Sequence, residues 1–383
     1  MIKIKTDLIK EITSKINKGI EGERTVRVSE LLELKVEGNK LILAVTNTQF
    51  YLTIELTTGI EGNDNLHVTV DADTFIKLIS KTTTSEIILE ESNGNLIFKG
   101  NGQYIFPLEL DKDGQIKTLP KIELTNTTSQ FEISGDTLYS IYSFGSHELV
   151  NDVPVETIQK YYYVDNLGAI TYTESPYLNN FQINTPFRVL MNDRLVQLFS
   201  LFRNQKVKVS LDKQINNSLY QNKISFECNN TKLVAYLPDD SLVESYPAAP
   251  CRTLQENPYP GNVTINRIDL ANALDRLNIF SVKDGNVVYK KAGKLEFTSD
   301  GLRITSIIDK NSELIKYENT PSYYSYTCYM NLAQLQRHAK ASNEINVDLH
   351  YGNDMSIMFT KENYSQIVVE MEDPTSSIEG LGL

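Results

Sequence analysis

The stretch NGNLIFKGNGQYIFPLELD, residues 93–111, places a short apolar run, a polar break and a second apolar run in succession. The same outline returns in residues 221–240 and again in residues 353–373. One phenylalanine occupies the same point of each copy, at intervals of about 130 residues: Phe98, Phe226 and Phe359. A period of that length corresponds to one domain, so the sequence predicts a chain built three times over.

The bulk composition fits three folded domains. The chain has 383 residues, of which 40% are hydrophobic and 22% are charged, within the range of ordinary globular proteins. We expect domain boundaries at residues 1–124, 125–253 and 254–383, with an extension at 372–383. Ile378, Leu381 and Leu383 give this extension an apolar side, which suggests the hypothesis of a plug over a binding pocket; a disordered end is the simpler alternative.

Compartment and cofactors can be addressed from what the sequence lacks. No apolar run approaches the roughly 20 residues of a membrane span, and the first fifteen residues mix charges where a signal peptide is continuously apolar. The three cysteines have no CxxC spacing, which suggests neither a disulfide framework nor a zinc site. We therefore expect a cytoplasmic protein with no membrane partner, no metal and no cofactor.

Each repeat is predicted to contain two amphipathic helices and antiparallel strands. The first helix of each repeat is expected at 7–18, 134–144 and 265–280, and the second at 71–82, 192–204 and 331–342. Asp71, Asn192 and Asn331 open the second helices as N-caps. Alternating strands follow at 85–91, 205–212 and 343–350. This order predicts an α+β fold with helices packed on antiparallel sheet.

Charge is unevenly distributed along the chain. The overall charge is −12, which by itself argues against binding to phosphates. However, residues 1–20, 186–206 and 331–342 together carry a net charge of +8. Lys and Arg are good helix formers, so solvated helix faces could account for this pattern. The sharper interpretation is a basic surface lined by helices on an otherwise acidic protein.

Several segments, taken in order, resemble the bacterial-type DNA sliding clamps, the DNA polymerase III beta subunit-like processivity factors. They are GERTVRVSELLELKVEGNKLILAVTNTQFYLTIEL (22–56), NGQYIFPLELDKDGQIKTLP (101–120) and NTKLVAYLPDDSLVESYP (230–247). The resemblance implies a head-to-tail homodimer ring whose helices surround duplex DNA without reading its sequence, and which tethers a DNA polymerase. The Asn-, Ile- and Lys-rich composition is typical of an AT-rich genome, and the weak match to the family's motifs favours a phage or plasmid origin.

The resemblance also implies functional residues. The cations expected to face DNA are Lys10, Lys18, Arg24, Lys77, Lys81, Arg194, Arg203, Arg276, Arg337 and Lys340. The dimer interface is expected to join Phe106 and Leu108 to Ile279 and Phe280. Polymerase and clamp loader peptides with short apolar motifs are expected in a pocket formed by Thr173, Ser175, Tyr177, Leu178, Pro247, Arg252, Val368, Val369 and Met371. Ser175-Pro176-Tyr177 replaces the family's Gly-His-Arg, so the chemistry of that pocket is altered.

Two other function classes compete with this interpretation. An enzyme is disfavoured because the four His residues have no metal-binding spacing, and because no P-loop or GxGxxG motif is present. Asp71 and Asp73 are better explained as a helix start than as a metal site. A hydrolase using paired carboxylates lacks a defensible spacing. The stronger rival is a triplicated, β-rich viral or cellular structural protein without DNA function, which would have no need of basic helices.

Overall fold

The computed structural model describes residues 1–20, 26–62, 65–145, 158, 161–172, 176–179, 188–213, 221–280, 291–322, 325–341, 344–361 and 364–374. By internal contacts the chain divides into two units. Unit 1 comprises Met1–Tyr139 with Leu198–Asp239, and unit 2 comprises Ser140–Gln197 with Asp240–Leu383. Each unit is described by itself.

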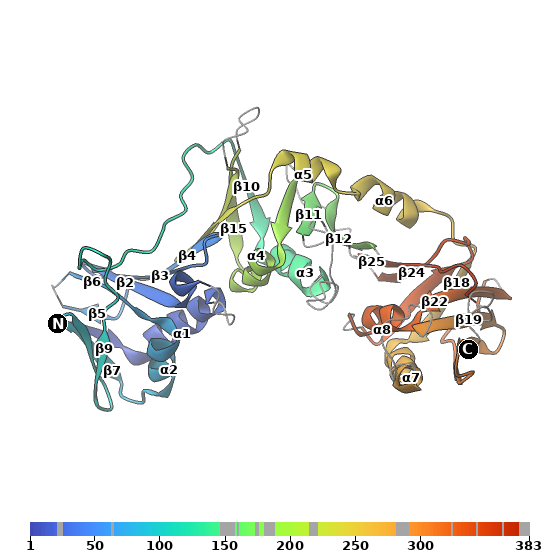
Figure 1. The fold of residues 1–383 in the computed structure, drawn as a ribbon, viewed down its shortest axis with the longest axis horizontal. Helices are drawn as coiled ribbons and strands as arrows, with labels where there is room; N and C mark the ends of the chain where they lie inside the picture. Colours follow the sequence, from blue (N-terminus) through green and yellow to red (C-terminus); the bar gives the residue numbers. More distant parts are fainter. Residues whose placement is uncertain are drawn as a thin grey trace. The chain divides into compact units, whose positions relative to one another are not determined.

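Unit 1 contains two antiparallel sheets (Figure 1). The five-stranded sheet has the order β5 (Ile60–Glu61), β1 (Ile2–Lys5), β7 (Glu86–Ser92), β8 (Asn95–Lys99) and β9 (Gln103–Pro107). The eight-stranded sheet has the order β10 (Ser129–Ser134), β15 (Lys206–Asp212), β16 (Lys223–Cys228), β17 (Thr231–Tyr236), β4 (Phe50–Leu56), β3 (Lys40–Thr46), β2 (Leu31–Glu37) and β6 (Leu66–Asp71).

Helices α1 (Thr6–Ile16) and α2 (Ala72–Lys81) pack side by side in unit 1 (Figure 1). Ile9, Ile12 and Ile16 of α1 are buried, as their helical spacing predicts, and α1 contacts β3 and β4. Unit 1 also contains short 3₁₀ turns at Asn17–Gly19, Arg27–Glu30 and Leu198–Leu201. Helix α3 (Gly135–Gly145) begins in unit 1, directly after β10.

Unit 2 also contains two antiparallel sheets. The eight-stranded sheet has the order β14 (Val189–Asn192), β11 (Tyr161–Asp165), β12 (Gly168–Tyr172), β13 (Pro176–Asn179), β25 (Tyr364–Val369), β24 (Ser356–Lys361), β23 (Asn346–Tyr351) and β18 (Gly261–Asn266). The four-stranded sheet has the order β21 (Ser312–Ile315), β20 (Gly301–Ser306), β19 (Ala292–Thr298) and β22 (Tyr326–Asn331).

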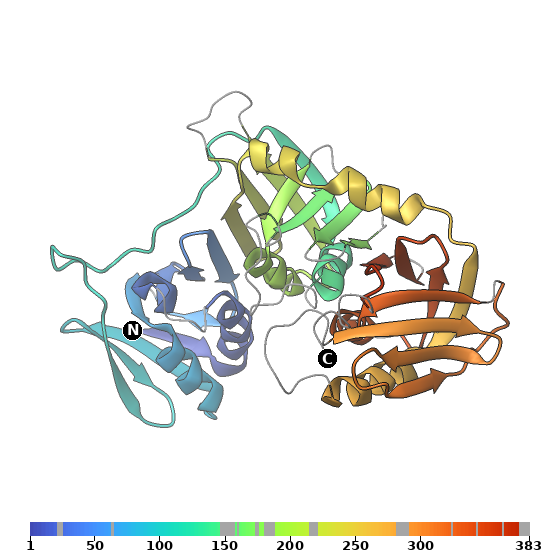
Figure 2. The same cartoon turned by 45° about the vertical axis from the view of Figure 1, so that its right-hand side comes forward.

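Five helices of unit 2 complete the fold: α4 (Asp193–Gln197), α5 (Asp240–Ser245), α6 (Ala248–Glu256), α7 (Arg267–Phe280) and α8 (Leu332–Ala341). Helices α7 and α8 lie side by side, and their apolar residues form one core with strands of both sheets. Figure 2 shows α5 and α6, coloured yellow, following one another along the strands of unit 2.

The repeated stretch is a β-hairpin in all three places, which confirms the meaning of the sequence repeat. The hairpins are β8–β9, β16–β17 and β24–β25. Phe98, Phe226 and Phe359 are all buried in them. The predicted α+β fold is therefore confirmed, while the three-domain boundaries stay a prediction.

The predicted N-caps form as expected. The backbone N–H of Thr74 donates to Asp71 at 2.9 Å, and that of Leu195 donates to Asn192 at 2.8 Å. Asn331 accepts from the N–H groups of Ala333 and Gln334. A helix start leaves backbone donors without partners, and these side chains satisfy them. Capping therefore explains Asp71 without a metal.

Helices α5 and α6 were not predicted from the sequence, and the length of one other helix was overestimated. The segment 192–204 forms only the short α4, followed by the 3₁₀ turn Leu198–Leu201. Helices of six and nine residues give too few turns for a clear apolar period, and Pro247 and Pro250 flank or open α6.

We predict that Asn331→Ala lowers the free energy of unfolding by about 1 kcal/mol, because two N–H groups of α8 lose their acceptor. Chemical denaturation measures the change. Asn331→Asp keeps an acceptor oxygen and should stay close to the wild type. Equal losses in both variants would show that the cap does not stabilise α8.

Candidate nucleic-acid interface and docking edges

Helices α1 and α2, with the 3₁₀ turn that follows α1, carry four of the predicted DNA-facing cations. Lys81 is exposed and Lys10 is half-buried, and neither forms an ion pair within the described part of the chain. Lys77 pairs with Asp73 one turn earlier, at 2.7 Å. The Lys18 ammonium donates to the Ser200 hydroxyl at 3.2 Å, so it links α1 to the second part of unit 1. These helices present positive charge, with Lys77 partly neutralised.

Arg203 is the predicted cation nearest to α3. Its guanidinium lies 4.7 Å from the centre of the Tyr139 ring and 4.0 Å from the Asp136 carboxylate. Both contacts come from α3, a helix without Lys or Arg. Arg203 therefore supplies positive charge beside a helix that offers hydroxyls and one acid.

In unit 2 two of the four predicted cations, Arg276 and Lys340, are paired with acids. Arg276 of α7 makes a two-pronged ion pair with Glu313 of β21, at 2.7 and 3.0 Å. Hydrogen bonding raises the pKa of Arg276 and lowers that of Glu313. Lys340 of α8 pairs with Asp275 of α7 at 2.6 Å.

Arg194 and Arg337 are half-buried, and Arg194 donates to Gln197 at 3.1 Å. Arg24 lies outside the described residues. Surface ion pairs contribute only about 0–1 kcal/mol, so a phosphate can replace the paired carboxylate at little cost. The structure thus gives a set of helix cations, several of which are held in place by exchangeable acidic partners.

The predicted peptide pocket corresponds to the junction where β13 pairs with β25. Leu178 lies opposite Ser365 there. Leu178 is buried in an apolar cluster that α5 and α6 cover with side chains such as Val243 and Cys251. Tyr246 stacks on Tyr163 with ring centres 5.2 Å apart. This junction therefore has an apolar centre to which helices α5 and α6 contribute side chains.

Arg252 of α6 is fixed beside this cluster. Its guanidinium donates to both oxygens of Asp165, at 2.9 and 2.7 Å, and it lies over the Tyr163 ring. Pro247 sits at the N-cap of α6. The pair holds α6 against the turn between β11 and β12.

The remaining pocket residues lie in separate surroundings. Val368 is buried in the core under α7 and α8, whereas Val369 is 41% exposed. Met371 packs with Ala292 and Ile307, and its backbone N–H donates to the carbonyl of Tyr329. Thr173 and Ser175 lie outside the described residues, as does most of the extension, from residue 375 onward; only the backbone of Tyr177 is described.

Two strand edges carry exposed apolar side chains. β9 ends the five-stranded sheet, and Tyr104 and Ile105 on it are exposed, Ile105 by 61%. A groove of about 480 Å³ lies between β9 and the α2 residues Thr74 and Leu78. Phe106 and Leu108, the predicted interface residues, are buried. Phe106 packs against Phe75 of α2, with the ring centres 5.6 Å apart.

The second edge is β21 of the four-stranded sheet. Leu314 on β21 is exposed, and at the end of α7 Ile279 and Phe280 are 68% and 57% exposed. Ile279 and Phe280 were predicted at the interface from the sequence, whereas the exposed Tyr104, Ile105 and Leu314 were not. The alternation within QYIFP and SELI could have indicated these exposed residues. It does so only once both segments are known to be edge strands.

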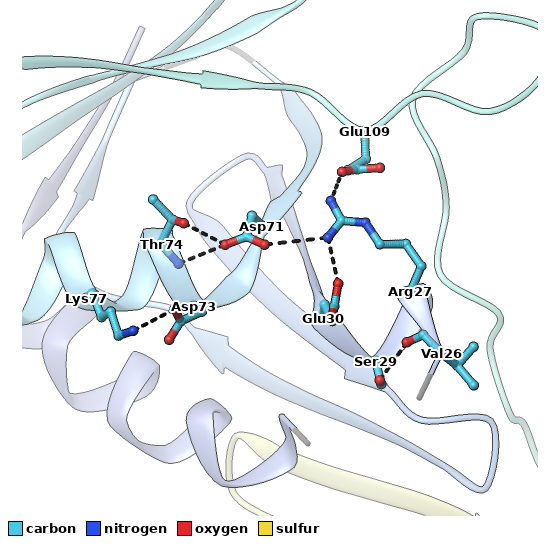
Figure 3. A network of polar contacts seen from close by, with 9 residues as sticks. All are labelled: Val26, Arg27, Ser29, Glu30, Asp71, Asp73, Thr74, Lys77 and Glu109. Atoms are coloured by element: carbon cyan, nitrogen blue, oxygen red, sulfur yellow. Dashed lines mark hydrogen bonds and ion pairs between the residues drawn. The ribbon is translucent and has the colours of Figure 1, made fainter. Parts of the chain in front are cut away.

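A polar network fixes the end of β9 (Figure 3). The Arg27 guanidinium contacts the carboxylates of Glu30, Asp71 and Glu109. The hydrogen bonds to Glu30 and Glu109 raise the pKa of Arg27. Asp71 caps α2, and Glu109 follows β9 by two residues, so one guanidinium ties together both walls of the groove.

Comparison with solved structures identifies this arrangement. The chain superposes on the beta subunit from DNA polymerase of Streptococcus pyogenes with a TM-score of 0.76, at 16% identity, over 97% of this chain and 100% of the other. The DNA polymerase III beta chain of Streptococcus pneumoniae gives a TM-score of 0.78 at 14% identity, over 97% of this chain and 99% of the other. The fold is that of the sliding clamps.

A third structure, the DNA polymerase sliding clamp from Bacillus subtilis, gives a TM-score of 0.76 at 12% identity, over 97% of this chain and 99% of that one. No family model and no curated protein matches the sequence. The sliding-clamp fold therefore covers 97% of the chain, at a sequence identity that establishes architecture alone.

Among the described residues, no three His, Cys, Asp or Glu side chains come together as a metal site would require. None of the described helices combines the length and the apolar character of a membrane span.

We predict that Arg252→Met lowers the free energy of unfolding by about 3 kcal/mol, because it leaves the Asp165 carboxylate, 7% exposed, without its ion-pair partner. Urea denaturation monitored by tyrosine fluorescence measures the loss. Adding Asp165→Asn should recover most of it, since the buried charge is then removed as well. A double variant as unstable as Arg252→Met would contradict this explanation.

Proposed function

We propose that the protein is a sliding clamp, a processivity factor that encircles duplex DNA and tethers a replicative DNA polymerase. The observation that carries the proposal is the sliding-clamp fold, which covers 97% of this chain and essentially all of each neighbour. A fold by itself does not fix a function. The helix cations and the open strand edges add independent support, because a clamp needs both.

The proposed ring would repeat a kind of strand pairing that the chain already uses twice. β17 pairs with β4 in unit 1, and β25 pairs with β13 in unit 2. In the repeat order β9 corresponds to β17 and β25, and β21 corresponds to β4 and β13. β9 and β21 are the two members of these sets that end a sheet. A head-to-tail second copy would pair them and close a homodimer ring.

Exposed apolar residues support these edges as the interface. Tyr104 and Ile105 correspond to Leu233 and Val234 of β17, which are buried beside β4. In the ring, Ile279 and Phe280 of one copy would meet the groove between α2 and β9 of the other. Phe106 and Leu108 would then act from inside, by supporting the edge strand.

Duplex DNA would pass along the basic helices. Lys10, Lys18, Lys81 and Arg203 would contribute in unit 1, together with Arg24 and Lys77. Arg194, Arg276, Arg337 and Lys340 would contribute in unit 2. Such cations attract the phosphate backbone without reading base edges, so binding would be independent of sequence and sensitive to salt. The acidic remainder of the protein would repel DNA from other surfaces.

Partners would dock where β13 meets β25. A DNA polymerase and a clamp loader would insert short apolar motifs beside Leu178, Pro247 and Arg252, with Val369 at the open edge. Thr173, Ser175, Tyr177, Val368 and Met371 complete the proposed set. The protein would act in the cytoplasm as three clamp domains, 1–124, 125–253 and 254–383, without catalysis of its own. The weak match to the family's motifs favours a phage or plasmid gene.

Retention on DNA tests the function directly. The protein is loaded onto a nicked circular plasmid with a clamp loader or by spontaneous opening, part of the sample is linearised, and both are passed through gel filtration in moderate salt. A ring should stay on the circle and slide off the linear form, because its hold is topological. Equal retention on both forms would indicate contact binding, and no retention would favour a structural protein.

We predict that Ile105→Glu weakens self-association at least tenfold, because it places a charge in the apolar interface. Sedimentation velocity over a concentration series measures the dissociation constant. Ile345→Glu makes the same change at a comparably exposed residue, 67% against 61%, away from both strand edges. Equal dissociation constants for the two variants would remove β9 from the interface.

A further inference from the structure

The chain that leaves β25 continues along the edge of the four-stranded sheet of unit 2. Two residues after β25, the backbone N–H of Met371 donates to the carbonyl of Tyr329 at 2.8 Å, and the two residues form an antiparallel bridge. Tyr329 belongs to β22, the strand that ends this sheet. The Tyr329 hydroxyl donates to Asp373 at 3.0 Å, and Pro374 is buried. The beginning of the extension 372–383 is therefore held at the β22 edge.

Unit 1 has the same arrangement after β9. Glu109, two residues beyond β9, donates its backbone N–H to the carbonyl of Thr69 on β6 at 2.8 Å. Thr69 and Tyr329 each stand two residues before the cap of the helix that follows, α2 or α8. Glu109 and Met371 are therefore equivalent. The segment after Glu109, residues 110–124, is the counterpart of the extension and is called the linker here.

The structure describes the path of the linker in unit 1. The linker first turns back, because the N–H of Lys117 donates to the carbonyl of Glu109 at 2.9 Å. It then places Leu119, which is 1% exposed, in an apolar cluster with Leu31 of β2 and Ala44 of β3. The linker therefore docks on the sheet of its own repeat through one leucine, ten residues after the edge contact.

The extension repeats the spacing of the linker. Counted without a gap from the two equivalent residues, an acid, an isoleucine and a leucine recur at the same steps: Asp111, Ile116 and Leu119 in the linker, and Asp373, Ile378 and Leu381 in the extension. The leucine is the member of this set that packs on the sheet in unit 1. The extension therefore carries an apolar side chain at the step where the linker makes its contact.

The residues that receive the linker leucine have counterparts in unit 2. Leu31 pairs with the cap of α2, and Ala292 pairs with the cap of α8, so these two residues are equivalent. Two residues further along β2 and β19, the cross-strand partners are Ala44 on β3 and Thr305 on β20. Ala292 is buried in a small apolar cluster that Met371 joins. A leucine that docks as in the linker would therefore meet Ala292 and Thr305.

Charge on this face of the sheet also fits the extension. Lys294 and Arg303 lie on the face turned away from α7 and α8, because their neighbours along the strands belong to the core beneath these helices. Residues 372–383 contain three acids and no Lys or Arg. Hydrogen bonding to Glu296 raises the pKa of Lys294, and the nearby Asp373 carboxylate adds to this effect. The first part of the acidic segment thus already lies beside a cation of this face.

We propose that residues 375–383 dock on this face of the four-stranded sheet, with Leu381 beside Ala292 and Thr305, as the linker docks Leu119 in unit 1. Docking covers part of the β22 edge, whose backbone groups would otherwise be open to pairing with another chain. It leaves the junction of β13 with β25 free for partner peptides, and it replaces the hypothesis of a plug over that pocket. The proposal does not depend on ring closure.

Disulfide trapping in the full-length protein locates the extension. Leu381→Cys is combined either with Thr305→Cys on the proposed docking face or with Val369→Cys, which is 41% exposed at the edge of the peptide pocket. The three native cysteines are buried. After mild oxidation, peptide mapping should find about tenfold more cross-link to Thr305→Cys, because a disulfide requires the two Cα atoms to lie within roughly 7 Å.

Proteolysis gives a second measurement with a matched control. A glutamate-specific protease cleaves after Glu379, and docking should slow this cleavage relative to the free peptide 375–383. Leu381→Asp should raise the relative rate about fivefold, because a charge at the apolar contact favours the undocked state. Leu383→Asp makes the same change at the step that matches Lys121, an exposed residue of the linker, and should leave the relative rate unchanged.

The outcomes decide between the docking face, the pocket and a free end. Preferential cross-linking to Thr305→Cys, with faster cleavage in Leu381→Asp alone, supports the proposal. Preferential cross-linking to Val369→Cys supports the plug and overturns the proposal. Equal cross-linking at both positions, or equal relative cleavage rates in wild type and both Asp variants, also overturns it. None of these measurements uses DNA or a second copy, so their outcome does not bear on the proposed function.

Discussion

Hydrogen bonding at sheet edges is the constraint on which the rest of the structure depends. An unpaired edge exposes a row of backbone donors and acceptors, and folded proteins cover such edges. This chain covers them with its own repeats, since β17 pairs with β4 and β25 pairs with β13. Each pairing joins the end of one repeat to the middle of another, so any repeat of this kind is incomplete alone. β9 and β21 end their sheets with the apolar side chains Ile105 and Leu314 exposed, and the proposed ring would cover both edges.

In the proposed clamp, the helices would meet a different physical requirement. An acidic protein that holds DNA needs positive charge in one place, yet cations crowded together repel one another. Here the conflict is eased locally, because Asp73, Asp275 and Glu313 each accept a cation from the predicted set. Such pairs are weak at a surface, so they keep the side chains ordered without removing them from reach of a phosphate. Binding that is loose and independent of sequence suits a ring, because topology and not affinity would keep it on DNA.

The sequence predicted what local periodicity and composition control. The three hairpins, the helices α1, α2, α7 and α8, and the caps at Asp71, Asn192 and Asn331 all follow from short-range patterns. Side-chain exposure at the strand edges was less predictable, because Phe106 and Ile105 are neighbours whose roles depend on which face α2 covers. The ion pairs of Arg276, Lys340 and Arg252 join residues distant in sequence, so no spacing rule reveals them. Helices α5 and α6 were missed because tertiary packing stabilises them more than their own short turns do.

Strand pairing within one chain and strand pairing between two chains differ in what can fix the register. Backbone pairing alone tolerates a slip of two residues, and the two internal pairings differ from each other by that amount. Inside one chain the connecting segments remove the ambiguity. Between two chains no connection exists, so side chains must select the register. In the proposed ring, apolar contacts such as those of Ile105 would be nearly non-directional, whereas polar and charged side chains at the rim would distinguish one register from the next. An asymmetric interface of this kind therefore needs charged residues at its rim even though its centre is apolar.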